Sequence, residues 1–303
     1  MINSKQAPKI IVRIKGGLGN QLFAYAAARR LAIVNNAELV IDHVTGFSRD
    51  LQYQRQYALA RFCIPVRTAT SSERLEPFER YRRGIIKWIS GKSTFLDRSY
   101  LEQEGIDFDG RLLDLKVSTT LYLDGLWQSE NYFKDVESII REDLRITSPQ
   151  DAENLQMAEK IASCNAVALH VRWFEDANSA TVHNLSIEYY QQAIALIEQK
   201  VESPHYFLFS DHPAAAAQKI NLPERNVTFI SHNVGDENAY ADLWLMSQCQ
   251  HFITANSTFS WWAAWLGSNP RKIITTPMCS TITAVTAWNF DGLIPASWYI
   301  IES

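Results

Sequence analysis

The sequence contains few cysteines, and they are widely spaced. Cys63, Cys164, Cys249 and Cys279 are the four cysteines of a 303-residue chain, and they form no Cys-x-x-Cys pair and no zinc-type spacing with histidine. This pattern argues against a disulfide framework and against a structural zinc site. It predicts free thiols in a reducing compartment.

Long apolar runs and a strong charge of one sign are also missing. No stretch approaches the roughly 18 apolar residues that a membrane span needs, and the N-terminal stretch has no apolar segment of signal-peptide length. The net charge of −4 argues against a nucleic-acid partner. We therefore expect a cytoplasmic protein without a transmembrane segment, in which positive charge for an anionic ligand is local.

The chain does have a large apolar content, 47% of its residues, which is enough for one large or two mid-sized domains. Its first half has the pattern of a strand, a glycine-rich turn at 16–20, a helix and a second strand. The expected elements are strands at 9–15, 38–42 and 120–124, helices at 21–35 and 130–144, and helices with loops over 46–118.

Proline and small polar residues cluster at 146–152 and indicate a linker. After it, apolar patterns of strand and helix alternate. The expected strands are 166–172, 206–210, 226–230, 251–255 and 272–275, and the expected helices are 153–163, 186–201, 213–219, 237–248 and 259–267. This alternation predicts an α/β fold with a mainly parallel, doubly wound sheet, and domains at 1–150 and 151–303.

Polar residues stand where three of these strands end. His170 and Arg172 close the first of them and share one face, because side chains alternate along a strand. Asp211 follows the second strand, and Asn256-Ser257-Thr258 follows a third. Ligands of open α/β sheets bind beyond the carboxyl ends of the strands, so a single ligand explains the whole set.

A guanosine diphosphate fits the chemistry of these strand ends. Arg172 offers a forked donor to a diphosphate. Ser257, Thr258 and the backbone N–H groups that follow suit further phosphate oxygens at a helix start. The carboxylate of Asp211 suits the N1–H and the amino group of guanine.

The glycine-rich turn allows a different interpretation. Gly17 and Gly19 follow a strand, and Asp42 closes the next one, as in a dinucleotide-binding fingerprint, although Leu22 occupies the place of the third glycine. A nicotinamide-dependent oxidoreductase that uses these residues is therefore an alternative. The amides of Asn20 and its neighbour instead suit hydrogen bonds to a sugar or phosphate across a cleft.

Two further patterns are more typical of structure than of function. Trp261, Trp262 and Trp265 have helical spacing, which favours core packing over a sugar-binding platform, and a non-catalytic sugar-binding protein is the other alternative. The Asp-Phe-Asp sequence at 107–109 matches a metal-binding pair, but so short a match arises readily by chance. We predict no metal site.

Five short segments complete the pattern in a fixed order along the chain. They are GGLGNQLF at 16–23, GLWQS at 125–129, HVR at 170–172, FSD at 209–211 and NSTFSWW at 256–262. In this order they resemble the bacterial α-1,2-fucosyltransferases of glycosyltransferase family 11.

The resemblance implies two Rossmann-like domains in a GT-B-like architecture, with the nucleotide-sugar site in the C-terminal domain. It implies inverting, metal-independent transfer of fucose from GDP-β-L-fucose to the 2-hydroxyl of a terminal β-galactoside, without a cofactor. The acceptor would be a lipid-linked bacterial O-antigen or surface glycan, which fits a cytoplasmic enzyme with peripheral membrane association. A fucosyltransferase of another linkage is a further alternative.

The resemblance also implies roles for individual residues. The catalytic residues would be Arg172 and Asn20 together with Glu175 or Asp176. The donor would be bound by Gly17, Gly19, Asn20, His170, Arg172, Asp211, Asn256, Ser257, Thr258 and Phe259. The acceptor would meet Trp127, Gln128 and His183.

One segment departs from the family pattern. The family commonly has His-x-Arg-Arg-Gly-Asp, whereas Trp173 and Phe174 stand here in place of the second arginine and the glycine. The acidic residue of the pattern aligns with either Glu175 or Asp176, so the carboxylate beside the sugar is left open between them.

Overall fold

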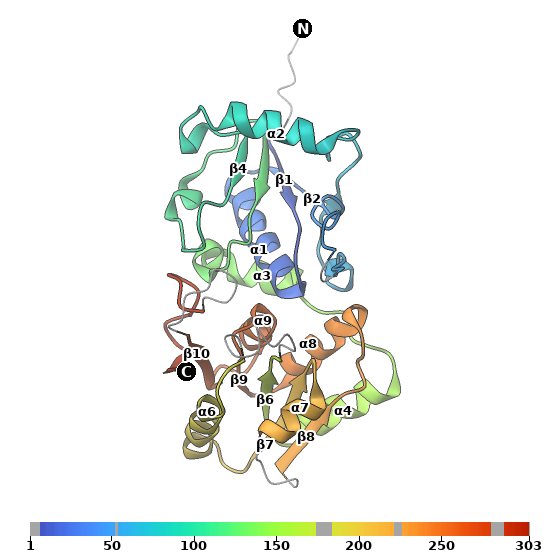
Figure 1. The fold of residues 1–303 in the computed structure, drawn as a ribbon, viewed down its shortest axis with the longest axis vertical. Coiled ribbons are helices and arrows are strands. Elements are labelled where there is room, and N and C mark those ends of the chain that lie inside the picture. The colour runs from blue at the N-terminus through green and yellow to red at the C-terminus, as the bar shows by residue number, and fades with distance from the viewer. Residues whose placement is uncertain (1–6, 52–53, 174–183, 221–225, 280–287, 303) are drawn as a thin grey trace. The chain divides into compact units, whose positions relative to one another are not determined.

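The computed structural model describes residues 7–51, 54–173, 184–220, 226–279 and 288–302. The chain divides into two compact units, each containing a parallel sheet (Figure 1). Unit 1 comprises Met1–Arg145 and Asp291–Leu293, and unit 2 comprises Ile146–Phe290 and Ile294–Ser303. The main division thus falls at 145/146, where the sequence suggested 150/151. A short C-terminal segment also returns to unit 1, which the simple division at 150/151 did not include.

Unit 1 has a five-stranded parallel sheet in the order β3-β2-β1-β5-β4. Its strands are β1 (Lys9–Arg13), β2 (Glu38–Asp42), β3 (Arg67–Thr68), β4 (Tyr100–Glu102) and β5 (Thr120–Asp124). Its helices are α1 (Leu18–Val34), α2 (Glu79–Ser90) and α3 (Glu137–Asp143). Short 3-10 turns are η1 (Leu59–Arg61), η2 (Phe95–Asp97), η3 (Gly110–Asp114), η4 (Glu130–Tyr132) and η5 (Lys134–Val136).

Strand β1 and helix α1 form the centre of unit 1. Ile10 and Val12 on one face of β1 and Ile11 on the other are all buried, as expected for a parallel strand covered on both faces. Helix α1 is alanine-rich, so it packs closely, and Phe23 and Tyr25 fill the space around it. The helix expected at 130–144 is wrong in its first half. The buried Phe133 follows η4, η5 begins directly after it, and only α3 is α-helical.

Unit 2 has a six-stranded parallel sheet in the order β11-β10-β9-β6-β7-β8. Its strands are β6 (Asn165–Val171), β7 (Pro204–Ser210), β8 (Val227–Ile230), β9 (His251–Ile253), β10 (Ile274–Met278) and β11 (Tyr299–Glu302). Its helices are α4 (Ala152–Ala162), α6 (Ile187–Lys200), α7 (Pro213–Lys219), α8 (Ala239–Gln248) and α9 (Thr258–Leu266), and η7 (Asp236–Asn238) precedes α8. The predicted parallel α/β fold is confirmed, whereas β11 was not anticipated.

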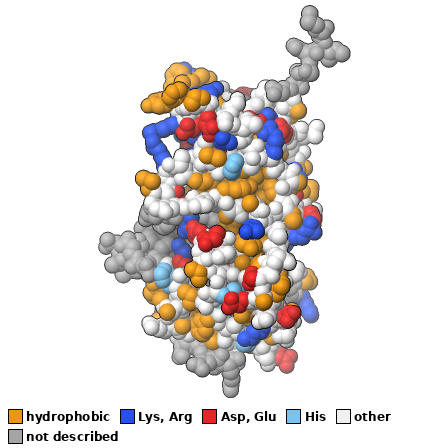
Figure 2. Space-filling view, turned by 90° about the vertical axis from the view of Figure 1, so that its right-hand side faces the viewer, with side chains coloured by type: hydrophobic (Ala, Val, Ile, Leu, Met, Phe, Trp, Pro, Cys, Tyr) orange, Lys and Arg blue, Asp and Glu red, His pale blue; other side chains and the backbone are white. Residues whose placement is uncertain are grey.

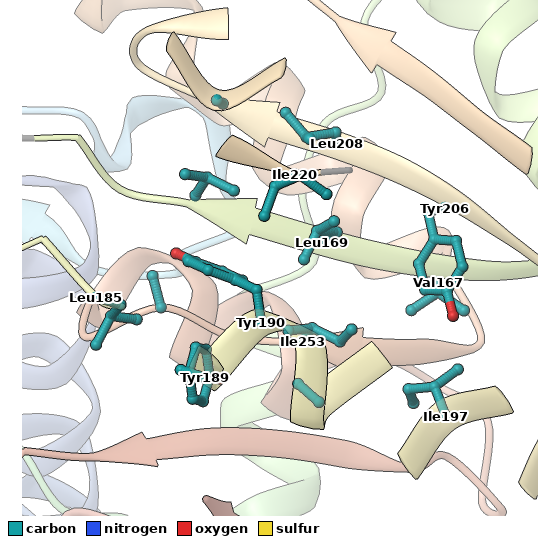
Figure 3. Packing of buried hydrophobic residues seen from close by; sticks show 14 of the residues in the cluster. Val167, Leu169, Leu185, Tyr189, Tyr190, Ile197, Tyr206, Leu208, Ile220 and Ile253 are labelled. Atoms are coloured by element: carbon teal, nitrogen blue, oxygen red, sulfur yellow. The ribbon is translucent and has the colours of Figure 1, made fainter. Parts of the chain in front are cut away.

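The core of unit 2 lies between the sheet and α6 (Figure 3). Val167, Leu169 and Val171 of β6 face Tyr190 and Ile197 of α6, and all five side chains are essentially buried. Because side chains alternate along a strand, Ala166, Ala168 and His170 point to the opposite face. One face of β6 therefore packs in the core, and the opposite face carries the polar side chain of His170.

The returning segment Asp291–Leu293 is held in unit 1 by specific hydrogen bonds. The backbone N–H of Asp291 donates to Asp107 Oδ1 over 2.9 Å, and the hydroxyl of Ser129 donates to the carbonyl of Gly292 over 2.6 Å. Gly292 has φ +78°, and an added Cβ would lie 2.7 Å from the Cβ of Phe108. Asp109 caps η3 and pairs with Arg111. The two carboxylates at 107 and 109 thus make structural contacts.

Candidate functional site

The sheet of unit 2 has a topological switch point between β6 and β9. From β6 the chain adds β7 and β8 on one side, and then β9, β10 and β11 on the other. Loops diverge from such a point at the carboxyl ends of the strands, which leaves a crevice where nucleotides bind in this class of fold. The segments that follow β6 and β9 are those where the sequence placed Arg172 and Ser257.

Arg172 and Asp211 meet directly across the ends of β6 and β7. Val171 pairs with Ser210 in the register of these strands, so the residues that follow them lie side by side. The guanidinium of Arg172 forms an ion pair with Asp211 Oδ2, and the backbone N–H of Trp173 donates to Asp211 Oδ1 over 2.9 Å. Both charged side chains are a little more than a quarter exposed. The pair therefore presents a positioned guanidinium at the edge of the sheet.

His170 lies beneath this pair as a buried, neutral imidazole. The residue is 5% exposed, and among the described residues its Nδ1 has no hydrogen-bond partner. Burial, and secondarily the positive charge of Arg172, lowers the pKa of His170 to about 3. The ring packs against Phe259 with 5.7 Å between centroids. His170 and Phe259 therefore connect the end of β6 to the first turn of α9.

Helix α9 begins at Thr258, a short turn after β9 ends at Ile253. Ser257 is its N-cap, and its Oγ accepts from the N–H of Phe259 over 3.3 Å. The Ser260 hydroxyl donates to the carbonyl of Ser257 and accepts from the N–H of Ala255, which fixes the turn. The positive end of a nine-residue helix thus lies at the carboxyl end of β9, a geometry that suits an anion.

Two adjacent tyrosines of α6 hold the strand ends of the switch point. The Tyr189 hydroxyl donates to the carbonyl of Thr254, just after β9, and the Tyr190 hydroxyl donates to the carbonyl of His170 in β6 over 3.4 Å. Both side chains are buried. Neither tyrosine was identified as a site residue from the sequence. The signal was present, because two tyrosines within an apolar pattern need partners for their hydroxyls.

The glycine-rich turn of unit 1 lies at the switch point between β1 and β5. Gly16 has φ +76°, and an added Cβ would lie 3.0 Å from Asn20 Nδ2. Gln128 Nε2 donates to Asn20 Oδ1 over 2.7 Å, so these two predicted site residues are in contact. Gln21 fixes the turn by donating to the carbonyl of Gly16 and accepting from the N–H of Ala58. Gly17 is the N-cap of α1, and Gly19 lies buried in its first turn.

Asp124, at the end of β5, was not identified from the sequence. Its carboxylate accepts from Lys15 Nζ over 2.7 Å, Arg13 Nη1 over 3.0 Å and the Tyr100 hydroxyl over 2.9 Å. Burial alone would raise the pKa of Asp124, but the charges of Lys15 and Arg13 outweigh it and lower the pKa below its usual value. The ionised carboxylate therefore anchors the strand end that precedes the glycine-rich turn.

Two residues of unit 1 have local structural partners. Trp127 is 1% exposed and packs edge-on against Tyr132 with 5.6 Å between centroids, and acceptor contact by this residue stays a prediction. Asp42 accepts from the hydroxyl and the N–H of Thr45, and from the N–H of Val44 over 3.2 Å. Asp42 is 3% exposed, so its carboxylate is not accessible to a ribose. Glu175, Asp176 and His183 lie outside the described residues, as does Phe174.

The segments that form these two switch points match a known family. Residues 9–280 match the model described as Glycosyl transferase family 11. The chain belongs to glycosyltransferase family 11. This family 11 glycosyltransferase is 27% identical over 308 residues to the Escherichia coli protein named alpha-1,2-colitosyltransferase, an alignment that covers 97% of this chain and 99% of the relative. It is 30% identical over 295 residues to the E. coli O-antigen biosynthesis glycosyltransferase WbnK, and this alignment covers 87% of the present chain and 92% of WbnK.

Solved structures with the same fold include the fucosyltransferase NodZ and FUT1. NodZ from Bradyrhizobium has a TM-score of 0.50 at 19% identity, covering 89% of this chain and 95% of NodZ. A mutant of Arabidopsis thaliana FUT1 in complex with GDP has a TM-score of 0.55 at 12% identity, and the match covers 90% of this chain and 71% of FUT1. At these identities the likeness concerns the fold. Together with the two parallel sheets it confirms the predicted fold class, two Rossmann-like domains of the GT-B type.

Proposed function

We propose that this family 11 glycosyltransferase transfers L-fucose from GDP-β-L-fucose to the 2-hydroxyl of a terminal β-galactoside. One observation supports the proposal above all. The guanidinium of Arg172 is oriented by its ion pair with Asp211 just after the carboxyl end of β6, at the switch point of the sheet. Helix α9 begins after β9, the strand on the other side of this switch point. Fixed positive charge and a helix N-terminus at one edge suit a diphosphate.

The proposed reaction is a direct displacement at the anomeric carbon. The acceptor oxygen forms the new bond to carbon 1 of fucose while the bond from that carbon to the β-phosphate oxygen breaks, which inverts the configuration. The electron pair leaves with GDP, and the hydroxyl proton passes to Glu175, Asp176 or the phosphate. Arg172 neutralises the charge that develops on the departing phosphate, so no metal ion is needed. Asn256 and Thr258, just before and at the start of α9, are proposed to line the donor, whereas Asn20, which accepts from Gln128, and Gly17 and Gly19 stay predicted donor contacts.

A second candidate donor is GDP-colitose. The relative that covers 97% of this chain is named a colitosyltransferase. Colitose is L-fucose without the 3-hydroxyl, so the same displacement chemistry serves both sugars. Trp173, in place of the family's second arginine, removes a polar donor next to Arg172 and is compatible with the less polar sugar.

The proposal predicts a clear pattern of ligand binding and turnover. GDP, GDP-fucose and GDP-colitose are expected to raise the thermal midpoint of the purified protein, whereas NAD leaves it unchanged. Incubating each donor with a β-galactoside should give a product whose linkage is read by NMR, with the sugar on the 2-hydroxyl and activity retained in EDTA. Stabilisation by NAD alone, or no transfer from either donor, would overturn the proposal. Transfer to a hydroxyl other than the 2-hydroxyl would replace it with the alternative linkage.

Asp211 has two proposed roles that one substitution separates. If its carboxylate accepts from both the N1–H and the amino group of guanine, the wild type should bind GDP about 10- to 100-fold more tightly than IDP, which lacks the amino group. Asp211→Asn should then lose most of this preference in a calorimetric titration, whereas the exposed control Glu188→Gln keeps it. If Asp211→Asn retains the preference while kcat falls, Asp211 orients Arg172 instead and does not read guanine.

A further inference from the structure

Helix α2 of unit 1 exposes a stripe of large apolar side chains. Tyr81, Ile85, Trp88 and Ile89 are 75%, 57%, 65% and 55% exposed, and Phe78, just before the helix, is 71% exposed. Their spacing of three and four residues puts them on one side of the helix. We call these five residues the α2 stripe. An amphipathic helix usually turns such a face to the core, and here the face points outward.

The opposite side of α2 is fixed to unit 1. The Ser90 hydroxyl donates to the carbonyl of Tyr100 over 3.0 Å and accepts from its N–H over 2.9 Å, which ties the last turn to β4. Arg83 donates to the Thr45 hydroxyl over 2.7 Å, and Lys87 pairs with Glu102 of β4. The helix is therefore anchored by its polar side. The α2 stripe is not needed to hold the helix on the sheet.

The surface around the stripe is cationic. Residues 78–92 contain five basic side chains and one acidic one, Glu79. Arg80, Arg82 and Lys92 are exposed, and the ammonium of Lys92 lies 3.4 Å from the centroid of the Trp88 ring. Arg80, Tyr81, Gly84, Ile85 and Trp88 line an open hollow on this surface. In Figure 2 hydrophobic side chains gather at the upper edge of the view, next to lysine and arginine side chains.

This combination matches the interface of an anionic membrane. Tryptophan and tyrosine are favoured at the boundary between headgroups and acyl chains, and amphipathic helices that lie in it combine such residues with lysine and arginine. Anionic lipids attract each nearby cation. A symmetric dimer through the same face would instead oppose two cationic rims, because a two-fold interface brings each patch against its own copy. The positive charge around the α2 stripe therefore favours an anionic lipid surface over a second copy of the chain as its partner.

We propose that the α2 stripe docks this protein on the surface of an anionic lipid bilayer, with the apolar side chains in the headgroup region and the surrounding cations on the lipid phosphates. Helix α2, with 12 residues, is proposed to lie in the plane of the interface. Among the described residues no helix has the length and apolarity to cross a bilayer. This inference goes beyond the proposed reaction and does not depend on the identity of the donor or acceptor.

The test is flotation of the purified full chain with vesicles, without nucleotide or acceptor. One set of vesicles combines phosphatidylethanolamine with phosphatidylglycerol, and the other contains phosphatidylcholine alone. The variants are Ile85→Ser with Trp88→Ser, and Arg80→Glu with Lys92→Glu. The matched controls are Val234→Ser, which changes an apolar residue that is 73% exposed in unit 2, and Arg271→Glu, which reverses an exposed charge there. Circular dichroism and the thermal midpoint verify that each variant is folded.

The wild type is expected to float with the anionic vesicles and not with the neutral ones. The apolar double variant should lose about tenfold or more of its partition coefficient, because two side chains no longer enter the interface. The charge-reversal variant should lose about fivefold for each cation removed, and the controls should float like the wild type. Absence of wild-type flotation, or equal flotation of folded variants, would overturn the proposal. A dimer in sedimentation analysis that Ile85→Ser with Trp88→Ser dissociates would also overturn it, since a second copy would then cover the stripe.

Discussion

Arg172→Lys is expected to lower kcat for sugar transfer by about 10²–10³, close to the effect of Arg172→Ala, because each loses one pre-aimed donor at the departing phosphate. The guanidinium has a planar fork, so it can keep its ion pair with Asp211 and still direct other N–H groups to a diphosphate. A lysine ammonium is a point charge at the end of a flexible chain. It would stay beside Asp211 or reach the phosphate, and would not do both with fixed geometry.

The measurement is single-turnover transfer at saturating donor, which isolates the chemical step from donor binding. The matched control is Arg271→Lys, the same substitution at an exposed arginine of unit 2, which should leave kcat unchanged. Near-normal turnover of Arg172→Lys would remove the guanidinium from the mechanism. Equal loss of turnover in Arg172→Lys and Arg271→Lys would show that the loss is not specific to Arg172 and would contradict its assignment.

Trp261→Ala should destabilise unit 2 by roughly 3–5 kcal/mol, the usual cost of deleting a large buried aromatic side chain. Trp261 is fully buried, and its ring centroid lies 5.1 Å from that of Trp262, 6.4 Å from that of Trp265 and 5.5 Å from that of Trp298. The indoles of Trp261, Trp262 and Trp265, all in α9, pack on each other, and Trp298 packs on Trp261. Removing one leaves a cavity that rigid neighbours cannot close.

Urea denaturation compares Trp261→Ala with Trp88→Ala, which removes an indole that is 65% exposed. The exposed site should change the free energy of unfolding by no more than about 1 kcal/mol. Equal losses at the two sites would contradict the core assignment of Trp261. The burial of Trp261, Trp262 and Trp265 already confirms core packing as the reason for their spacing, and it leaves these three rings no exposed face for a sugar.

The sequence predicted the strands and strand ends of unit 2 best, because the signal there is local. Apolar runs bounded by polar residues located β6, β7 and β9 to within two residues at each end. Alternation along β6 put His170 and Arg172 on one face. The parallel order of neighbouring strands then brought Arg172 to Asp211. The ion pair itself could not be predicted, because it depends on the conformation of the loops that follow the strands, and periodicity gives no information about loop conformation.

Features that depend on distant contacts were missed. Helix α2 lies in a region whose elements the sequence could not resolve, and periodicity does not tell whether an apolar stripe faces the core or the outside. Strand β11 is short and half exposed, so its apolar pattern is weak, and it is defined by pairing with β10. Asp124 looked like an ordinary strand end, because its three partners come from elements far along the chain.

The segment Asp291–Leu293 limits how this protein can be recombined with its relatives. The polypeptide passes from one unit to the other near residue 145 and again on either side of this segment. A chimera joined only at the first passage would receive residues 291–293 from the other parent. The foreign segment would then have to satisfy Asp107 and Ser129. A hybrid that exchanges C-terminal halves should therefore keep this tripeptide with the parent that supplies the amino-terminal half.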